Sequence, residues 1–182
     1  MTARSDIRLV THTPEHIRGL IAGDAEYQER FGTAVAADLR EFFLGPEVSE
    51  SFLTRIRETA APDPWRDGCG ILLLPDNRLI GVCSFNGPPD PDGAVEISYG
   101  VAPDYQGRGY ATEAARLLIG SAWAVPQVRR IFAKTLPEEN ASTRVLRKCG
   151  FNTYRELIDP VDGLIWRWEI ERPNNAIPLP AN

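Results

Sequence analysis

The middle of the chain predicts four segments in this order: a strand at residues 94–101, a glycine-rich turn, a helix at 109–123 and a second strand at 128–135. This order constrains the fold more than any other feature, because two strands joined through a helix lie parallel in one sheet. Residues 70–74 and 79–85 are two further β-rich segments separated by a short turn, and such neighbours pair antiparallel. The sequence therefore predicts a mixed sheet with helices on its faces.

The rest of the chain continues this alternation of helices and strands. Apolar spacing predicts a strand at 6–10, helices at 14–22, 25–31, 46–60 and 141–149, and a final hairpin at 151–158 and 164–170. Thr13 and Pro14 supply an N-cap hydroxyl and a proline for the first helix. A length of 182 residues suits one domain, which we place at 1–172, with a frayed tail rich in proline and asparagine at 173–182.

Charge and composition exclude several classes of protein. A net charge of -5, from 25 acidic and 20 basic residues, argues against a broad surface for nucleic acid or an anionic membrane. The first residues lack the apolar run of a signal peptide, and no stretch approaches the roughly 18–20 apolar residues that span a bilayer. Three scattered cysteines and two distant histidines favour neither a disulfide framework nor a metal site. We expect a soluble, cytoplasmic monomer or homodimer without a metal.

The turn between residues 101 and 112 carries the most chemical information. The first turn of a helix has N–H groups without helical partners and a partial positive charge, and glycine lets an anion approach them. The sequence therefore predicts an anion-binding turn between Gly107 and Thr112, without specifying the anion. The alternative is that these glycines serve only a sharp turn.

The amino-acid sequence of this turn resembles the signature of a known family. Gln106-x-x-Gly109-x-Ala111 resembles the Q/R-x-x-G-x-G/A signature of the GNAT superfamily of N-acetyltransferases, and Gly150-Phe151 resembles a second signature. Residues 96–151 are similar to the branch that acetylates the N-termini of ribosomal proteins. The resemblance implies an α+β fold with a mixed, mostly antiparallel sheet of about seven strands, flanked by helices, in which one splayed strand pair admits CoA.

The resemblance also implies which residues bind acetyl-CoA. Backbone N–H groups of the glycine-rich turn would hold the pyrophosphate, and the main chain at Tyr99 to Val101 would bond the pantetheine arm. Arg108 would either contact a phosphate or remain a solvated surface arginine. The complete expected set is Tyr99, Val101, Gln106, Gly107, Arg108, Gly109, Tyr110, Ala111, Thr112, Asn140 and Ser142.

Acetyl transfer to an amine requires a neutral nitrogen. A lysine-like amine needs about 4–5 kcal/mol of help to lose its proton at pH 7, and an α-amine only about 1 kcal/mol. Glu96 is the candidate base, because it lies in an apolar strand where the family often has a glutamate. The alternative for Glu96 is a cross-strand ion pair or an edge carboxylate. Glu156, on the strand after Gly150-Phe151, is the second candidate base.

The group that protonates the departing thiolate is less clearly marked. Leu146 stands where many GNAT members have a tyrosine, and it cannot donate a proton. Ser142 matches a serine of the ribosomal-protein branch, or else serves as a helix N-cap. Glu139 stands where the family has an asparagine, and Asn140 follows one position later. The oxyanion would be held by a backbone N–H near Val101, by analogy with the family.

The residues and the resemblance together predict an enzyme that transfers acetyl from acetyl-CoA to an amine. The acceptor would be a protein or peptide N-terminal α-amine or a small-molecule amine. The main alternative is a non-catalytic protein that binds acyl-CoA and reports its level to a partner. A P-loop nucleotide binder is disfavoured, because the Gly-x-x-x-x-Gly-Lys-Ser/Thr pattern is absent from the sequence.

Overall fold

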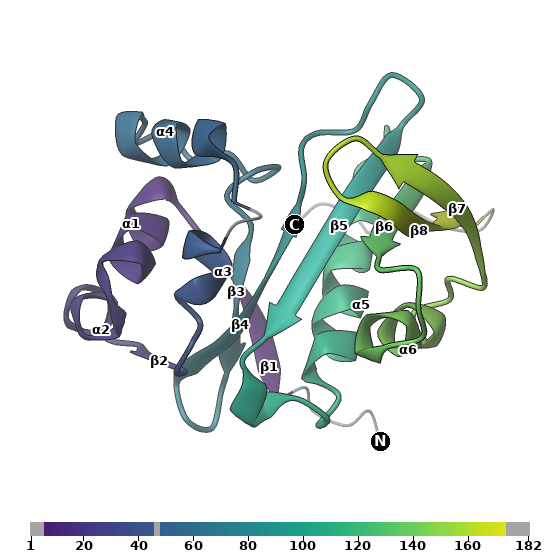
Figure 1. Ribbon diagram of the computed structural model, residues 1–182. Helices are drawn as coiled ribbons and strands as arrows, with labels where there is room; N and C mark the ends of the chain where they lie inside the picture. Colours follow the sequence, from purple (N-terminus) through teal and green to yellow (C-terminus); the bar gives the residue numbers. More distant parts are fainter. Residues whose placement is uncertain (1–5, 46–47, 174–182) are drawn as a thin grey trace. The chain divides into compact units, whose positions relative to one another are not determined.

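The computed structural model describes residues 6–45 and 48–173 (Figure 1). The chain divides into two compact units, and we describe each by itself. The first unit contains residues 1–84 and 99–114, and the second contains residues 85–98 and 115–182. In the described part of the chain there are eight strands, in the hydrogen-bonded order β1-β3-β4-β5-β6-β8-β7, with β2 beside β4. This mixed, mostly antiparallel sheet with helices confirms the predicted fold class.

The strands of the first unit form an antiparallel ladder with one short parallel addition. β1 pairs with β3 and β3 pairs with β4, both antiparallel, whereas β2 runs parallel to β4. Their bounds are β1 (Ile7–Thr11), β2 (Ala34–Val35), β3 (Cys69–Leu73) and β4 (Arg78–Phe85). The predicted strands agree within one residue at each end. β2 was not predicted from the sequence, because its two residues are too few to show any alternation.

Four helices of the first unit lie between β1 and β3 in the chain. They are α1 (Pro14–Ala22), α2 (Asp24–Phe31), α3 (Glu41–Leu44) and α4 (Glu50–Glu58). α1 matches its prediction, because the Thr13 hydroxyl accepts a hydrogen bond from the backbone N–H of His16 and Pro14 occupies the first position. The helix predicted at 46–60 is wrong at its ends. Ser49 caps α4 by accepting from the N–H of Phe52, and residues 46 and 47 lie outside the described residues.

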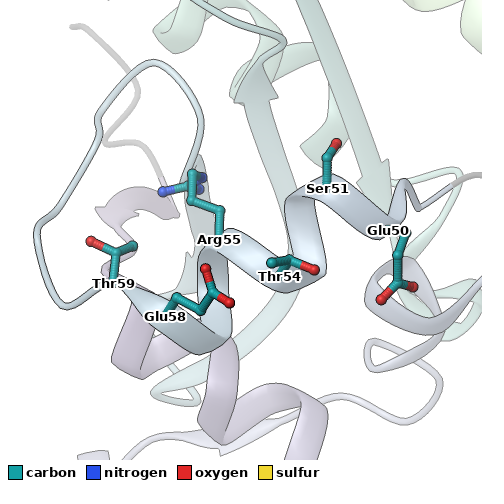
Figure 2. A pocket seen from close by; sticks show the side chains of 6 residues that line it. All are labelled: Glu50, Ser51, Thr54, Arg55, Glu58 and Thr59. Carbon is teal, nitrogen blue, oxygen red and sulfur yellow. The ribbon is translucent and has the colours of Figure 1, made fainter.

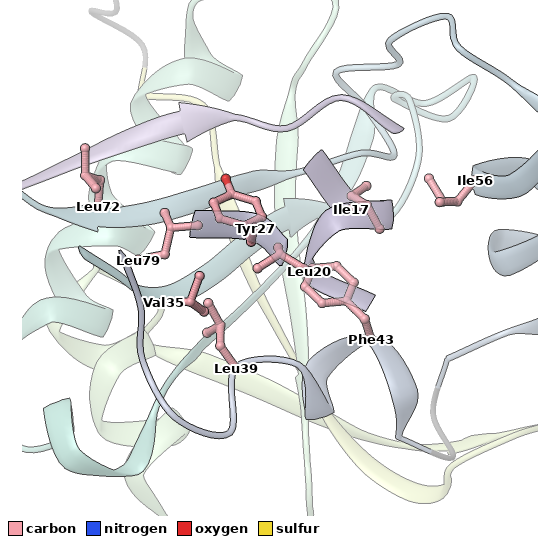
Figure 3. Packing of buried hydrophobic residues seen from close by; sticks show 9 residues of the cluster. All are labelled: Ile17, Leu20, Tyr27, Val35, Leu39, Phe43, Ile56, Leu72 and Leu79. Carbon is pink, nitrogen blue, oxygen red and sulfur yellow. The ribbon is translucent and has the colours of Figure 1, made fainter. Parts of the chain in front are cut away.

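The helices of the first unit bury their apolar faces against the sheet. Figure 3 shows the cluster that results, in which side chains far apart in the sequence meet. Its members are Ile17, Leu20, Tyr27, Val35, Leu39, Phe43, Ile56, Leu72 and Leu79. Because α3 contributes Phe43 to this cluster, its position is set by burial, although its four residues are too few for a periodic signal. α3 was not predicted from the sequence for that reason.

The predicted crossover uses residues of both units. β5 (Ala94–Val101) is followed by the 3-10 turn η1 (Pro103–Tyr105), by α5 (Tyr110–Trp123) and by β6 (Arg130–Thr135), which pairs parallel to β5. β5 belongs to both units, since its residues 94–98 lie in the second and 99–101 in the first. The predicted bounds of β5 are confirmed, and β6 begins two residues later than predicted.

The C-terminal half of the second unit completes its sheet. α6 (Ala141–Lys148) precedes the hairpin of β7 (Thr153–Asp159) and β8 (Gly163–Glu171). β8 pairs antiparallel with both β6 and β7. α5 and α6 lie side by side (Figure 1), and Arg116 of α5 donates to the carbonyl of Lys148 at 2.9 Å. The expected frayed tail falls on residues 174–182, outside the described residues, apart from Pro173. Among the described helices, none is long and apolar enough to cross a membrane.

The buried imidazole of His12 makes the stability of the protein dependent on pH. His12 is 1% exposed, and its Nε2 is buried without a hydrogen-bond partner. Burial, reinforced by the charge of His16, lowers the pKa of His12 to about 3. The folded state therefore keeps this ring neutral at a pH where the unfolded chain, with a pKa near 6.5, takes up a proton. Stability from this source is complete above about pH 6.5 and is lost as the pH falls toward 3.

We predict that His12→Leu removes this acid sensitivity. Between pH 7 and pH 5 the free energy of unfolding of the unaltered protein should fall by about 2 kcal/mol more than that of the variant, at about 1.4 kcal/mol per pH unit. Urea denaturation at the two pH values measures the difference. Carboxylates titrate in both proteins and cancel in the comparison, so equal losses would show that His12 is protonated in the folded state.

Candidate active site

A tight turn connects the end of β5 to the start of α5. The backbone N–H of Tyr105 donates to the carbonyl of Ala102 at 2.9 Å, and the N–H of Gln106 donates to Pro103 at 3.2 Å. The side-chain amide of Gln106 donates to the carbonyl of Val101 at 2.9 Å, which closes the turn back on the strand. Gln106, expected to contact the cofactor, therefore also has a structural role: it fixes the main chain at the end of β5.

The two glycines of this turn fit both interpretations of the sequence: a sharp turn that needs glycine and a backbone that an anion can approach. Gly107 and Gly109 have φ of +74° and +90°, a conformation that other residues adopt only with strain. A Cβ at either position would have no heavy atom within 4 Å, so the space beside both glycines is open. The turn thus requires glycine for its geometry and also leaves its backbone accessible.

The first helical hydrogen bond of α5 shows where its donors point. The N–H of Glu113 donates to the carbonyl of Gly109 at 3.0 Å. By the geometry of an α-helix, the N–H groups of Tyr110, Ala111 and Thr112 come before this bond and face the helix end, where the helix dipole is positive. Such an end attracts an anion. The expected phosphate-binding residues of the turn are thus contiguous in the first unit, together with Tyr99 and Val101.

Arg108 lies on the surface of the same turn. Its guanidinium donates to the carbonyl of Asp104 at 2.9 Å and lies 5.6 Å from the centre of the Tyr105 ring. These contacts keep the positive charge beside the two glycines while the side chain remains exposed. The position suits a phosphate contact and is equally that of a surface arginine.

β5 and β6 pair over only part of their length. Their parallel ladder joins Ala94–Glu96 to Arg130–Phe132, although β5 continues to Val101 and β6 to Thr135. Glu96 therefore occupies the last pair before the strands continue separately. On β5 beyond Val95, residues at even positions are the less buried ones, so Glu96, Ser98 and Gly100 share the more open face.

The carboxylate of Glu96 contacts a lysine that the sequence analysis did not identify. Lys134 Nζ lies 3.7 Å from Glu96 Oε2 and 2.9 Å from Asp159 Oδ2, and the Glu96 side chain is 20% exposed. Burial lowers the pKa of Lys134, but its hydrogen bond to Asp159 and the charge of Glu96 outweigh burial and leave that pKa raised. The hydrogen bond from Lys134, helped by two backbone N–H groups, lowers the pKa of Asp159 to about 2. The alternative interpretation of Glu96 as a cross-strand ion pair is thus present in the structure.

The second candidate base, Glu156, lies on β7 in the terminal hairpin. Its carboxylate accepts a hydrogen bond from the indole Nε1 of Trp166 at 3.0 Å. Trp166 also stacks on Tyr154, with ring centres 4.1 Å apart. Glu156 itself is exposed. This carboxylate is held by an aromatic pair on the hairpin surface, so the structure gives it a role in organising the hairpin.

The start of α6 corrects one interpretation. Asn140, not Ser142, is the N-cap: its side-chain oxygen accepts from the N–H of Thr143 at 3.1 Å, and its own N–H donates to the Thr143 hydroxyl. The alternative of Ser142 as a plain N-cap is therefore wrong, because Ser142 lies inside the first turn. Glu139 binds the guanidinium of Arg147. Leu146 is 1% exposed and belongs to the core.

A hollow of about 490 Å³ lies beside α4, in the first unit (Figure 2). Its lining consists of polar or charged side chains of α4 and of Thr59 just beyond it: Glu50, Ser51, Thr54, Arg55, Glu58 and Thr59. None of the residues expected to bind cofactor or to catalyse transfer lines this hollow. The residues for which the sequence predicts chemistry lie elsewhere in the chain, on β5, the glycine-rich turn and α6.

Comparison with known families gives the site its context. Residues 6–152 match the acetyltransferase (GNAT) domain. The chain belongs to the GNAT family. The resemblance that rested on Gln106-x-x-Gly109-x-Ala111 and Gly150-Phe151 is thereby confirmed for the family as a whole.

A curated relative supports this membership. The uncharacterized N-acetyltransferase YjdG of Bacillus subtilis (strain 168) is 30% identical over 112 residues, which cover 61% of this chain and 64% of the relative. The match thus spans less than two thirds of that relative.

Solved structures of GNAT proteins share the fold. The ribosomal-protein-S5-alanine acetyltransferase from Vibrio fischeri superposes with a TM-score of 0.63 at 14% identity, covering 94% of this chain and 96% of that one. RimL, a ribosomal L7/L12 α-N-protein acetyltransferase in complex with coenzyme A, superposes with a TM-score of 0.61 at 18% identity, covering 92% and 95%. At these identities the likeness concerns the fold.

The turn geometry predicts opposite effects of alanine at two glycines of the same helical region. Gly109→Ala forces a side chain into a φ of +90° and should lower the free energy of unfolding by about 1–2 kcal/mol. Gly120→Ala, within α5 and with open space around it, should raise it by about 0.5–1 kcal/mol. Urea denaturation measures both. Equal effects of the two changes would contradict the assigned turn conformation.

Proposed function

We propose that this GNAT protein transfers the acetyl group of acetyl-CoA to an amine. The observation that carries the proposal is the incomplete pairing of β5 and β6, which ends at Glu96, on the same strand that leads into the glycine-rich turn. One continuous strand thus connects a candidate base to a candidate phosphate site.

The glycine-rich turn is the proposed site of the CoA pyrophosphate. Positive φ at Gly107 and Gly109 turns the backbone, and the open space beside them admits phosphate oxygens to the donors at the start of α5. Arg108, held beside the turn by Asp104, would add a charge-assisted contact. The pantetheine arm would bond the main chain between Tyr99 and Val101, which Gln106 holds in position.

The proposed base is Glu96, on the open face of β5. The thioester oxygen would bond the main chain near Gly100 and Val101. Proton transfer would then run from the amine through water to the carboxylate. Asn140 and Ser142, at the start of α6, remain proposed cofactor contacts, with Ser142 a proposed proton donor to the thiolate.

The acceptor that this base suits best is an α-amine. Such an amine is neutral about a tenth of the time at pH 7, so a base acting through water has to supply only about 1 kcal/mol to its deprotonation. A small-molecule amine of similar basicity would serve as well. RimL, which has the same fold, is by its name an α-N-protein acetyltransferase, and this supports a protein or peptide N-terminus as acceptor.

A second candidate function is a non-catalytic acyl-CoA sensor. Two observations favour it: the buried Leu146 at the position of the family tyrosine, and the contact of Glu96 with Lys134. Calorimetry with acetyl-CoA, together with turnover on a peptide with a free N-terminus and on a polyamine, separates the two functions. Tight binding without transfer to any amine would support the sensor.

We predict that Glu96→Gln lowers kcat at least about 100-fold, since general-base catalysis is typically worth about 10²–10⁴. The dissociation constant of acetyl-CoA should stay within about twofold, because the proposed donor contacts lie on the main chain and the turn. Steady-state kinetics with the best acceptor of the panel and calorimetry provide the two numbers.

The matched control is Glu171→Gln, which removes another cross-strand ion pair, with Arg130, at the far end of β8. Glu171→Gln should leave kcat unchanged. A Glu96→Gln variant with full turnover, or one whose loss Glu171→Gln reproduces, would remove Glu96 from the chemistry and leave it as a structural carboxylate.

A further inference from the structure

The ring of Phe42 lies directly on the main chain of Gly100. A Cβ built on Gly100 would lie 2.3 Å from Cε1 and 2.6 Å from Cζ of Phe42, so the ring edge fills the space of the missing side chain. Phe42 nevertheless remains 41% exposed. Both residues belong to the first unit. An aromatic side chain therefore projects over the strand end at the point where Tyr99, Gly100 and Val101 follow one another.

The neighbours of Phe42 in α3 fix its position. Leu39 and Phe43 are buried in the hydrophobic cluster of the first unit, which anchors the segment on both sides of Phe42. The N–H of Phe42 donates to the carbonyl of Leu39 at 3.2 Å. Leu39 and Phe43 belong to this cluster and Phe42 does not. Burial in the cluster therefore does not explain why the ring of Phe42 lies on β5.

The strand beneath the ring is also held closely. A Cβ on Gly81 of β4 would lie 2.4 Å from the carbonyl oxygen of Gly100, so only a glycine lets the two strands approach so closely. The N–H of Ala102 donates to the carbonyl of Ile80 at 2.8 Å. β5 therefore cannot move away from Phe42 toward β4, and the ring faces a fixed surface.

The face of β5 under Phe42 is the one that carries Glu96. Side chains at positions 96, 98 and 100 project from the same side of the strand, and the side chain of Gly100 would meet the Phe42 ring. In the proposed function the thioester lies beside the main chain at Gly100 and Val101. The acyl group attached to that thioester would then extend into the space that the ring borders.

We propose that Phe42 is the specificity-determining residue that limits the donor to a short acyl group. This inference rests on the proposed function and adds the chemical class of the donor to it. The half-exposed ring acts as a wall beside Gly100: an acetyl group fits against it, whereas a butyryl group meets the ring edge. A hydrophobic pocket discriminates by about tenfold or more for each methylene that it cannot accommodate.

Binding of non-hydrolysable thioethers tests the proposal without knowledge of the acceptor. Calorimetry should show that the unaltered protein binds S-ethyl-CoA at least about tenfold more tightly than S-butyl-CoA. Phe42→Ala should reduce this preference to within about twofold, chiefly by tighter binding of S-butyl-CoA. Phe42→Leu, which keeps an apolar side chain on α3, should give an intermediate ratio, and circular dichroism establishes that both variants are folded.

The control is Leu44→Ala, which shortens another exposed apolar side chain of the same helix, 44% exposed. This change should leave the preference as in the unaltered protein. An unchanged ratio in Phe42→Ala, or an equal change in Leu44→Ala, would overturn the role of Phe42 while acetyl-CoA binding still stands. Failure of the unaltered protein to bind either thioether would instead overturn the proposed function, and this inference with it.

Discussion

The partial ladder between β5 and β6 is the constraint on which the rest of the candidate site depends. A parallel pair joined through a helix is expected to continue for the length of its strands, yet here it stops at Glu96 and Phe132. Beyond that pair β5 is held from its other side and from its end, by Ile80 and by the side chain of Gln106. The end of β5 thus has partners other than β6.

The shared ammonium of Lys134 reconciles the two interpretations of Glu96. Asp159 holds the lysine at hydrogen-bond distance, whereas Glu96 lies farther away. At its longer distance, Glu96 is attracted to Lys134 by charge without a hydrogen bond from it. The attraction persists at this distance because Coulomb energy weakens only slowly with separation. Membership in an ion pair and participation in proton transfer are therefore compatible. Through its two contacts, Lys134 of β6 also links β5 to the end of β7, although these strands are far apart in the sequence.

Local signals account for most of what the sequence predicted. Thr13 and Pro14 define the start of α1, and alternation within residues 94–101 defines β5, because both depend on neighbouring residues alone. The glycines at 107 and 109 were recognised for the same reason. α3 escaped detection, since burial of Leu39 and Phe43 in a distant cluster, not helical spacing, decides its place. Lys134 and Phe42 were missed because their partners, Glu96, Asp159 and Gly100, come from other elements.

The cap of α6 illustrates how the start of a helix can be misplaced by two residues. Ser142 and Asn140 are both residue types common at N-caps, and only Ser142 was considered as a cap from the sequence. The structure ranks them through Thr143, whose hydroxyl and N–H both engage Asn140. A capping box requires two residues at fixed separation, and only Asn140 with Thr143 provides one here.

The contact between Phe42 and Gly100 has a consequence for the way this chain tolerates change. A side chain at position 100 would overlap the ring at position 42. A residue larger than glycine at position 100 is therefore acceptable only with a residue smaller than phenylalanine at position 42. The free-energy effects of altering the two positions are therefore non-additive, as expected for residues that share a space. In relatives of this chain the two positions should vary together, so that only one of them carries a bulky side chain.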